Sequence, residues 1–142
     1  MNSRERLPEI SHVFFIDRCL GKKQIAAILR NAGWQVEIHD DHFSPGAEDR
    51  VWLREVGERG WIVLTKDQHI RYRETELKAL IAANARAFVL TGGSLQGHEM
   101  AEAFKNAYPK MIRCIEKYPG PFIARVTKSG SISTVYLLSP QA

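Results

Sequence analysis

Three largely apolar segments of this chain each end in one or two aspartates. The aspartates are Asp17, the adjacent pair Asp40 and Asp41, and Asp67. If the three segments are parallel strands, their carboxyl ends lie along one edge of one sheet, where open α/β sheets bind ligands. Carboxylates that crowd together repel one another unless a cation lies among them. The pattern therefore predicts a site for a hard divalent metal ion, and with it a reaction.

A fourth acidic position, Glu48 and Asp49, opens a predicted helix. Each acid taken singly also fits a structural role, as a helix cap or a turn residue. One metal site would account for all four positions at once, because Mg²⁺ and Mn²⁺ prefer oxygen ligands such as carboxylates, waters and phosphate oxygens. Such an ion polarises a phosphodiester and lowers the pKa of an attacking water.

Basic side chains follow the first and third of these acids. The chain has 20 lysines and arginines against 16 aspartates and glutamates, a net charge of +4. The basic residues near the acids are Arg18, Lys22, Lys23, Lys66, Arg71 and Arg73. Positive charge beside carboxylates suits a phosphate-backbone substrate, with a solvated helix surface as the alternative. Arginine binds phosphate through two parallel hydrogen bonds, and Tyr72, between two arginines, could stack on a base.

Strand and helix patterns alternate along the part of the chain that carries these acids. The predicted strands cover residues 13–17, 34–38, 61–65 and 87–90. The predicted helices cover residues 21–32, 48–59, 74–84 and 98–117, the last of them interrupted near Pro109. Residues 40–47 are expected to form a loop, and residues 122–138 a C-terminal hairpin of two strands.

This alternation predicts an α/β fold with right-handed βαβ units, a mainly parallel sheet and helices on both faces, in a three-layer α/β/α sandwich. The C-terminal β-hairpin has no intervening helix. It could extend the sheet antiparallel, cover an edge, or pair with another copy to make a homodimer. At 142 residues the chain is expected to form one domain, residues 1–142, with a polar N-terminal tail over residues 1–11.

The apolar segments also bear on location. None approaches the ~20 residues of a membrane helix, and residues 1–11 contain no apolar signal-peptide core. The chain is therefore expected in the cytoplasm, with no membrane partner. Cys19 and Cys114 have no second ligand at zinc-finger spacing, which favours free thiols over a zinc site.

Four segments resemble PIN-domain ribonucleases: FFIDRCLG (14–21), HDDHF (39–43), EDRVWL (48–53) and VLTKDQHIRYR (63–73). They are most similar to the compact, VapC-like toxins of bacterial toxin–antitoxin operons. The resemblance covers roughly residues 13–95, and its last segment is the most specific. It implies an α/β/α sandwich that cleaves RNA with Mg²⁺ or Mn²⁺ held by three or four acids.

The resemblance also assigns the metal-binding, catalytic acids. The family's first aspartate falls on Asp17, and its aspartate after the TxD strand falls on Asp67, with the Thr65 hydroxyl nearby. The middle acids are assigned to Asp41 and Asp49, with Asp40 and Glu48 as reserves. Two features depart from the larger PIN pattern, since the loop before Glu48 is short and no aspartate after Asp67 is a clear fourth ligand.

Together these features predict a Mg²⁺- or Mn²⁺-dependent endoribonuclease. The resemblance implies the toxin of a toxin–antitoxin pair, with RNA as its substrate and a cognate antitoxin as its protein partner. Substrate phosphate is assigned to Lys66, Arg71 and Arg73. Two alternatives stay open. A receiver-like phosphoacceptor module has a similar doubly wound fold with an aspartate after its third strand, where Asp67 lies. A non-catalytic module would use the acids as caps and the basic residues to hold RNA or protein.

Overall fold

The computed structural model describes residues 12–21 and 23–139, and within them six strands form one sheet in the order β2-β1-β3-β4-β5-β6. The strands are β1 (Val13–Ile16), β2 (Gln35–Ile38), β3 (Ile62–Thr65), β4 (Arg86–Leu90), β5 (Phe122–Val126) and β6 (Ile132–Leu137). The first five strands are parallel, and β6 pairs antiparallel with β5. The C-terminal hairpin therefore extends the sheet. The predicted N-terminal tail and Lys22 lie outside the described residues.

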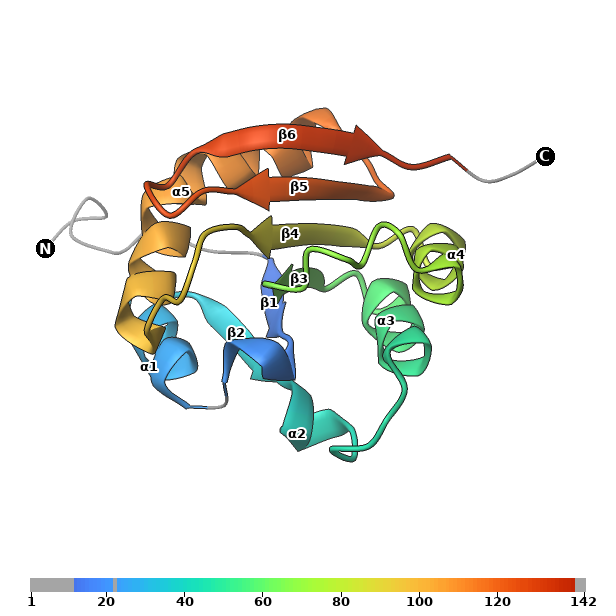
Figure 1. Cartoon of the computed structure of the whole chain (residues 1–142), viewed down its shortest axis with the longest axis horizontal. Helices are drawn as coiled ribbons and strands as arrows, with labels where there is room; N and C mark the ends of the chain where they lie inside the picture. The colour runs from blue at the N-terminus through green and yellow to red at the C-terminus, as the bar shows by residue number, and fades with distance from the viewer. Residues whose placement is uncertain (1–11, 22, 140–142) are drawn as a thin grey trace, which may run out of the picture.

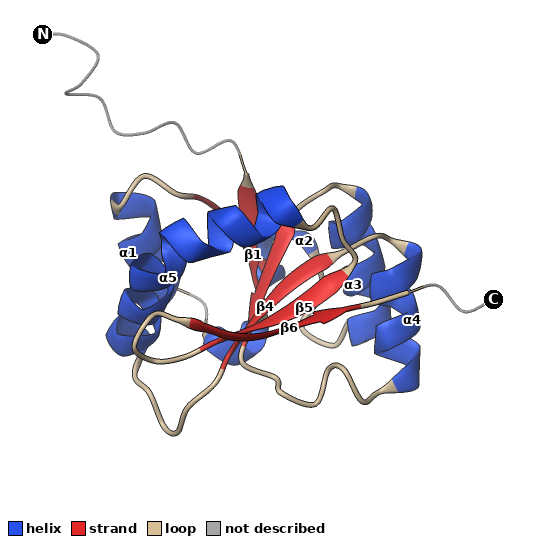
Figure 2. Ribbon diagram, turned by 90° about the horizontal axis from the view of Figure 1, so that it is seen from above, coloured by secondary structure: helices blue, strands red, loops and turns tan. Residues whose placement is uncertain are grey.

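Helices cover both faces of this sheet, which confirms the predicted three-layer α/β/α sandwich (Figure 1, Figure 2). On one face lie α1 (Gln24–Asn31) and α5 (Gly97–Lys117), and on the other lie α3 (Asp49–Glu58) and α4 (Glu74–Ala82). Two short elements follow the first two strands: the 3₁₀ turn η2 (Arg18–Leu20) and α2 (His39–His42). No helix in the described part of the chain has the length and apolarity needed to cross a membrane.

The sheet separates two apolar clusters, because successive residues of a strand point to opposite faces. In β1, Phe14 and Ile16 pack on the side of α1 and α5, whereas Phe15 packs on the side of α3 and α4. All three side chains are fully buried. A strand that is covered on both faces reads as a continuous apolar run, which is why the sequence reveals the central strands. Such strands leave only their ends for polar chemistry.

Three local predictions are wrong. The helix predicted from residue 21 begins only at Gln24, after the η2 turn, and the loop predicted from residue 40 begins with the helical turn α2. The helix predicted to break near Pro109 is the continuous α5. A proline removes one helical hydrogen bond, but Phe104 and Met111 on either side of it are fully buried against the sheet. This packing holds both halves of α5 in one helix.

Gly57 of α3 provides a test of the packing between α3 and the segment that follows α4. A Cβ atom at this position would lie 2.6 Å from the Cβ of Ala83 and 3.0 Å from the Cβ of Ala85. Gly57→Ala is expected to lower the free energy of unfolding in urea by about 1–3 kcal/mol, the usual effect of overpacking. Gly46→Ala is the matched control, since nothing lies within 4 Å of a Cβ there. Equal unfolding midpoints for the two variants would contradict this packing.

Candidate functional site

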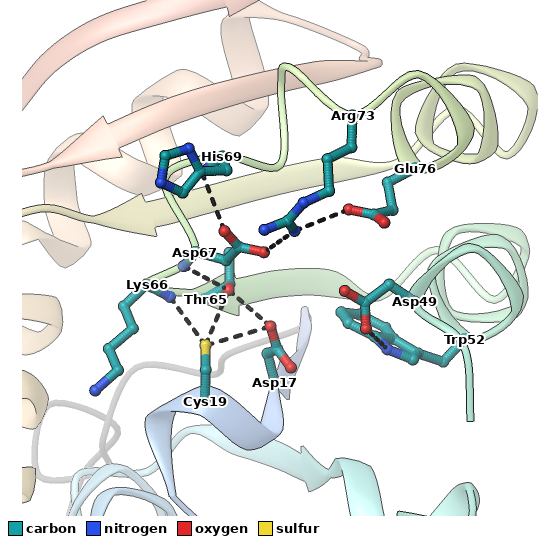
Figure 3. A network of polar contacts seen from close by, with 10 residues as sticks. All are labelled: Asp17, Cys19, Asp49, Trp52, Thr65, Lys66, Asp67, His69, Arg73 and Glu76. Carbon is teal, nitrogen blue, oxygen red and sulfur yellow. Dashed lines mark hydrogen bonds and ion pairs between the residues drawn. The ribbon is translucent and has the colours of Figure 1, made fainter. Parts of the chain in front are cut away.

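The candidate site lies at the carboxyl ends of β1 and β3, which are neighbours in the sheet. Asp17 directly follows β1, and its backbone N–H donates to the carbonyl of Leu64 in β3 at 3.0 Å. Asp67 follows β3 after one intervening residue, Lys66. Because the two strands are parallel, both aspartates lie at the same edge of the sheet (Figure 3).

The Asp17 carboxylate accepts hydrogen bonds from two side chains. The Thr65 hydroxyl donates to Asp17 Oδ2 at 2.8 Å, and the Cys19 thiol donates to the same oxygen at 3.3 Å. Burial raises the pKa of Asp17, the two hydrogen bonds oppose this rise, and the nearby charge of Asp49 adds to it. The fold therefore holds Asp17 in a place that disfavours its ionised form, which is a frequent property of functional carboxylates.

Cys19 links the two strand ends. Its sulfur lies 3.2 Å from the Thr65 hydroxyl and accepts a hydrogen bond from the Lys66 backbone N–H at 3.4 Å. Desolvation of the sulfur, together with the charge of Asp17, raises the pKa of the Cys19 thiol to about 11, although the residue as a whole is exposed. A raised pKa favours the protonated thiol, which is a poorer nucleophile than the thiolate. Cys19 and Cys114 are both free cysteines, as the sequence predicts.

Three carboxylates from different elements meet beside Asp17. They are Asp49 at the start of α3, Asp67 after β3, and Glu76 in the first turn of α4, here called the three-acid group. One oxygen of each lies within 4.8 Å of those of the other two. Neighbours fix two of these carboxylates. The Trp52 indole N–H donates to Asp49 at 3.0 Å, and the His69 backbone N–H donates to Asp67 at 3.0 Å (Figure 3).

Arg73 supplies positive charge to the three-acid group. Its guanidinium pairs with Asp67 at 2.5 Å and with Glu76 at 3.1 Å, and these two carboxylates raise the pKa of Arg73. A cation is thus already favoured at this point of the structure, as expected where like charges crowd together. All three acids offer hard oxygen donors and are half-buried. This donor set fits Mg²⁺ or Mn²⁺.

Other acids that the sequence singles out do not belong to the three-acid group. Asp40 accepts a hydrogen bond from Arg18 at 2.8 Å, and its Oδ1 lies 3.1 Å from His39 Nδ1. Asp41 lies exposed in the α2 turn, and Glu48 pairs with Arg50 on the surface at 3.1 Å. The helical turn in place of the expected loop gives Asp40 and Asp41 these positions.

Glu76 is the member of the three-acid group that the sequence did not reveal. The family pattern calls for an aspartate after Asp67, whereas this residue is a glutamate. A glutamate in the first turn of a helix is also explained by its favourable interaction with the helix dipole. The sequence contains one indication of Glu76, which is the similarity of its position to that of Asp49. Both acids lie in the first turn of a helix on the same face of the sheet.

The three basic residues assigned to phosphate take different positions. Arg73 lies on the acids, and the Lys66 side chain extends away from them (Figure 3). The Arg71 guanidinium lies 4.1 Å from the ring centroid of Tyr72 and 4.1 Å from that of Tyr136. Arg71 is thus held against aromatic rings, and the described part of the chain gives it no carboxylate partner.

The raised pKa of Asp17 predicts a pH-dependent effect of its substitution. The folded chain binds this proton more tightly than the unfolded chain. The stabilisation from protonation is therefore fully present below the ordinary pKa of 3.8 and is lost as the pH rises through the raised value. Asp17→Asn keeps a hydrogen-bond acceptor without the charge. We expect it to raise the melting temperature at neutral pH by about 2–4 °C, equivalent to ~1 kcal/mol.

This gain should shrink as the pH falls towards the ordinary carboxyl range. Thermal unfolding followed by circular dichroism across a pH series measures it, and Asp41→Asn, on the exposed surface of α2, is the matched control. A gain that grows at low pH, or one equal to that of the control, would show that burial of the Asp17 charge does not strain the fold.

Comparisons with known proteins identify the family of the chain. A relative from Mycobacterium tuberculosis (strain ATCC 25618 / H37Rv), named "Putative ribonuclease VapC45", is 28% identical over 130 residues, which cover 89% of this chain and 93% of the relative. No solved structure matches the chain significantly. The sequence profile described as "PIN like domain" matches residues 12–92, more than half of the chain, including Asp17, Asp49, Asp67 and Glu76. The chain therefore belongs to the PIN-like domain family.

Proposed function

We propose that this chain is a metal-dependent endoribonuclease that hydrolyses RNA phosphodiester bonds. The observation that carries the proposal is the three-acid group, which brings oxygens of Asp49, Asp67 and Glu76 within 4.8 Å of one another. Carboxylates at this spacing favour a cation among them. Membership of the PIN-like family and the ribonuclease name of the relative support RNA as the substrate class.

The residues that would hold Mg²⁺ or Mn²⁺ differ in one position from those assigned by sequence. The proposal keeps Asp17, Asp49 and Asp67, and it puts Glu76 in the place of Asp41. A bound divalent ion supplies Lewis acidity towards the phosphodiester and lowers the pKa of an attacking water. Asp17 lies at the edge of the group, close enough to Asp49 for the two charges to interact.

The chain's own side chains orient these acids and receive the substrate. Thr65 and Cys19 hold the Asp17 carboxylate, and the Trp52 indole holds Asp49. Arg73 balances the charge of the acids with which it pairs. Once those acids share another cation, its guanidinium becomes available to a substrate phosphate. Arg71 and Lys66 are further candidates to contact the RNA backbone.

The biological role is a further part of the proposal. We propose that the chain acts in the cytoplasm as the toxin of a toxin–antitoxin pair, and that a cognate antitoxin is its protein partner. This part rests on the resemblance of the sequence to VapC-like toxins.

The receiver-like alternative shares much of the fold. The order β2-β1-β3-β4-β5 also occurs in flavodoxin-like and receiver proteins, so topology does not separate the two classes. The family match and the participation of Glu76 in the three-acid group favour a nuclease. Stable phosphate uptake by Asp67 from a small phosphodonor would favour the receiver. RNA binding without cleavage, unaffected by EDTA, would favour the non-catalytic module.

RNA cleavage is expected to require Mg²⁺ or Mn²⁺ and to stop in EDTA. Asp67→Asn should lower the rate at least ~100-fold, because loss of outer partners of metal ligands already costs about 10–100-fold. Cleavage of a labelled RNA pool on denaturing gels measures this, with circular dichroism to verify the fold. Glu58→Gln is the matched control, an exposed acid of α3 paired with Arg54. Full activity of Asp67→Asn, or cleavage in EDTA, would refute the mechanism.

Arg73→Gln is expected to tighten metal binding, because it removes a positive charge that competes for Asp67 and Glu76. An ion pair of ~1 kcal/mol corresponds to about fivefold in the Kd for Mn²⁺. The signal of free Mn²⁺ in electron paramagnetic resonance measures this without any RNA. Arg50→Gln, which removes a surface partner of Glu48, is the control and should leave the Kd unchanged. Weaker Mn²⁺ binding by Arg73→Gln would mean that Arg73 does not compete with the ion.

A further inference from the structure

A pocket of about 460 Å³ opens next to the three-acid group, and Asp67 borders both. It lies between the loop that follows β3 and the strands β4, β5 and β6. Val89 and Ile123, which are almost fully buried, give it an apolar floor. Its volume is within the range of about 300–1,000 Å³ that is usual for small-ligand sites. Any group bound in it would therefore lie beside the proposed metal-binding acids.

Two arginines line this pocket without a carboxylate partner. Arg71 comes from the loop after β3 and Arg125 from β5, and neither forms an ion pair with any acid of residues 12–21 and 23–139. The one acid in the lining, Asp67, already pairs with Arg73. The pocket therefore has a surplus of positive charge. Guanidinium groups in this state suit a phosphate, which they bind through paired hydrogen bonds.

Aromatic rings stand beside these charges. Arg71 contacts the rings of Tyr72 and Tyr136, each at 4.1 Å to the centroid, and it donates a hydrogen bond to the Tyr72 hydroxyl. Contact with two rings fixes the guanidinium before any ligand arrives, which lowers the entropic cost of binding. Tyr72 itself is 65% exposed, unusual for a large hydrophobic side chain in this structure. An exposed ring beside cations is a platform on which a base can stack.

We propose that this pocket binds one unpaired nucleotide of an RNA strand, next to the bond that is cleaved. Arg71 and Arg125 hold a backbone phosphate, and the base stacks on Tyr72. This inference rests on the proposed endoribonuclease function and adds to it a nucleotide-binding site formed by Arg71, Arg125 and Tyr72. A base inside a duplex is stacked on its neighbours and cannot present a face to Tyr72. The pocket therefore accepts an unpaired base and not a base within a duplex.

RNA binding in EDTA tests the pocket apart from the metal. The probe is a short, fluorescein-labelled, single-stranded RNA of random sequence, and anisotropy gives the Kd. Arg125→Gln should raise the Kd about tenfold, as expected for a charge-assisted hydrogen bond. It should also reduce the slope of log K against log salt by about 0.7, the value for one phosphate contact to a single strand. Arg113→Gln, at an exposed position of α5, is the matched control and should leave both unchanged.

Tyr72→Leu should raise the Kd for the single strand by about five- to a hundredfold, the range for loss of one stacked base, with no change in salt slope. Tyr72→Phe keeps the ring and should bind like the unmodified chain. The Tyr72→Leu and Tyr72→Phe variants should bind a blunt duplex of the same length with equal Kd. With Mg²⁺ present, both Arg125→Gln and Tyr72→Leu should raise KM for single-stranded RNA more than they lower kcat.

The outcomes separate this inference from the function on which it rests. If the unmodified chain cleaves RNA but Arg125→Gln and Tyr72→Leu bind as it does, the pocket is not the nucleotide site although the nuclease proposal stands. If Tyr72→Leu weakens duplex and single strand equally, stacking on an unpaired base is refuted. If the unmodified chain neither binds nor cleaves RNA, both proposals fail together.

Discussion

Repulsion among carboxylates at one edge of the sheet is the constraint around which this structure is arranged. Asp17, Asp49, Asp67 and Glu76 come from four places in the chain and converge where β1 and β3 end. The protein offsets their charge with hydrogen bonds to Asp17 and Asp49 and with the guanidinium of Arg73. A cluster of carboxylates destabilises the fold when no cation lies among them. Its presence is explained if a dication is what the cluster holds.

The fold limits where such a cluster can form. The central strands are covered on both faces, so polar side chains can be accommodated only at their ends. α3 and α4 pack on the same face of the sheet, and each contributes an acid from its first turn. The same edge also holds Arg71 and Arg125, in a pocket whose lining includes Asp67 of the three-acid group. Negative and positive charges thus lie side by side, as a site for a metal ion and a phosphate backbone requires.

Much of this architecture is legible in the sequence, because the features that define it are local. Phe14 and Phe15 reveal a strand buried on both faces, and the alternation with amphipathic helices indicates a parallel sheet. The sequence allows three arrangements of the C-terminal hairpin, since the pairing of β5 with β4 is a long-range contact that no local pattern encodes. Pro109 misled for the same reason: tertiary packing of Phe104 and Met111 outweighs a local rule.

The residues of the candidate site also fall into two groups, those that local sequence patterns place and those that only tertiary packing places. Asp17 and Asp67 can be placed from sequence because each closes an apolar run, whereas the position of Glu76 depends on how α4 packs beside α3. The sequence assigns Asp41 as a metal ligand in a predicted loop, and the residue lies instead in a helical turn on the surface. The pocket was beyond the reach of sequence, because Tyr136 enters it only through the register that pairs it with Ile123. Local patterns find strand-end residues, and tertiary packing selects their partners.

Anomalous diffraction at the manganese edge, from crystals of the intact chain grown with Mn²⁺, tests the central claim most directly. We expect an anomalous peak bounded by oxygens of Asp49, Asp67 and Glu76, with the Arg73 guanidinium moved off those carboxylates. Crystals in which Arg73 keeps both of its ion pairs at saturating Mn²⁺, with no peak among the three acids, would contradict it.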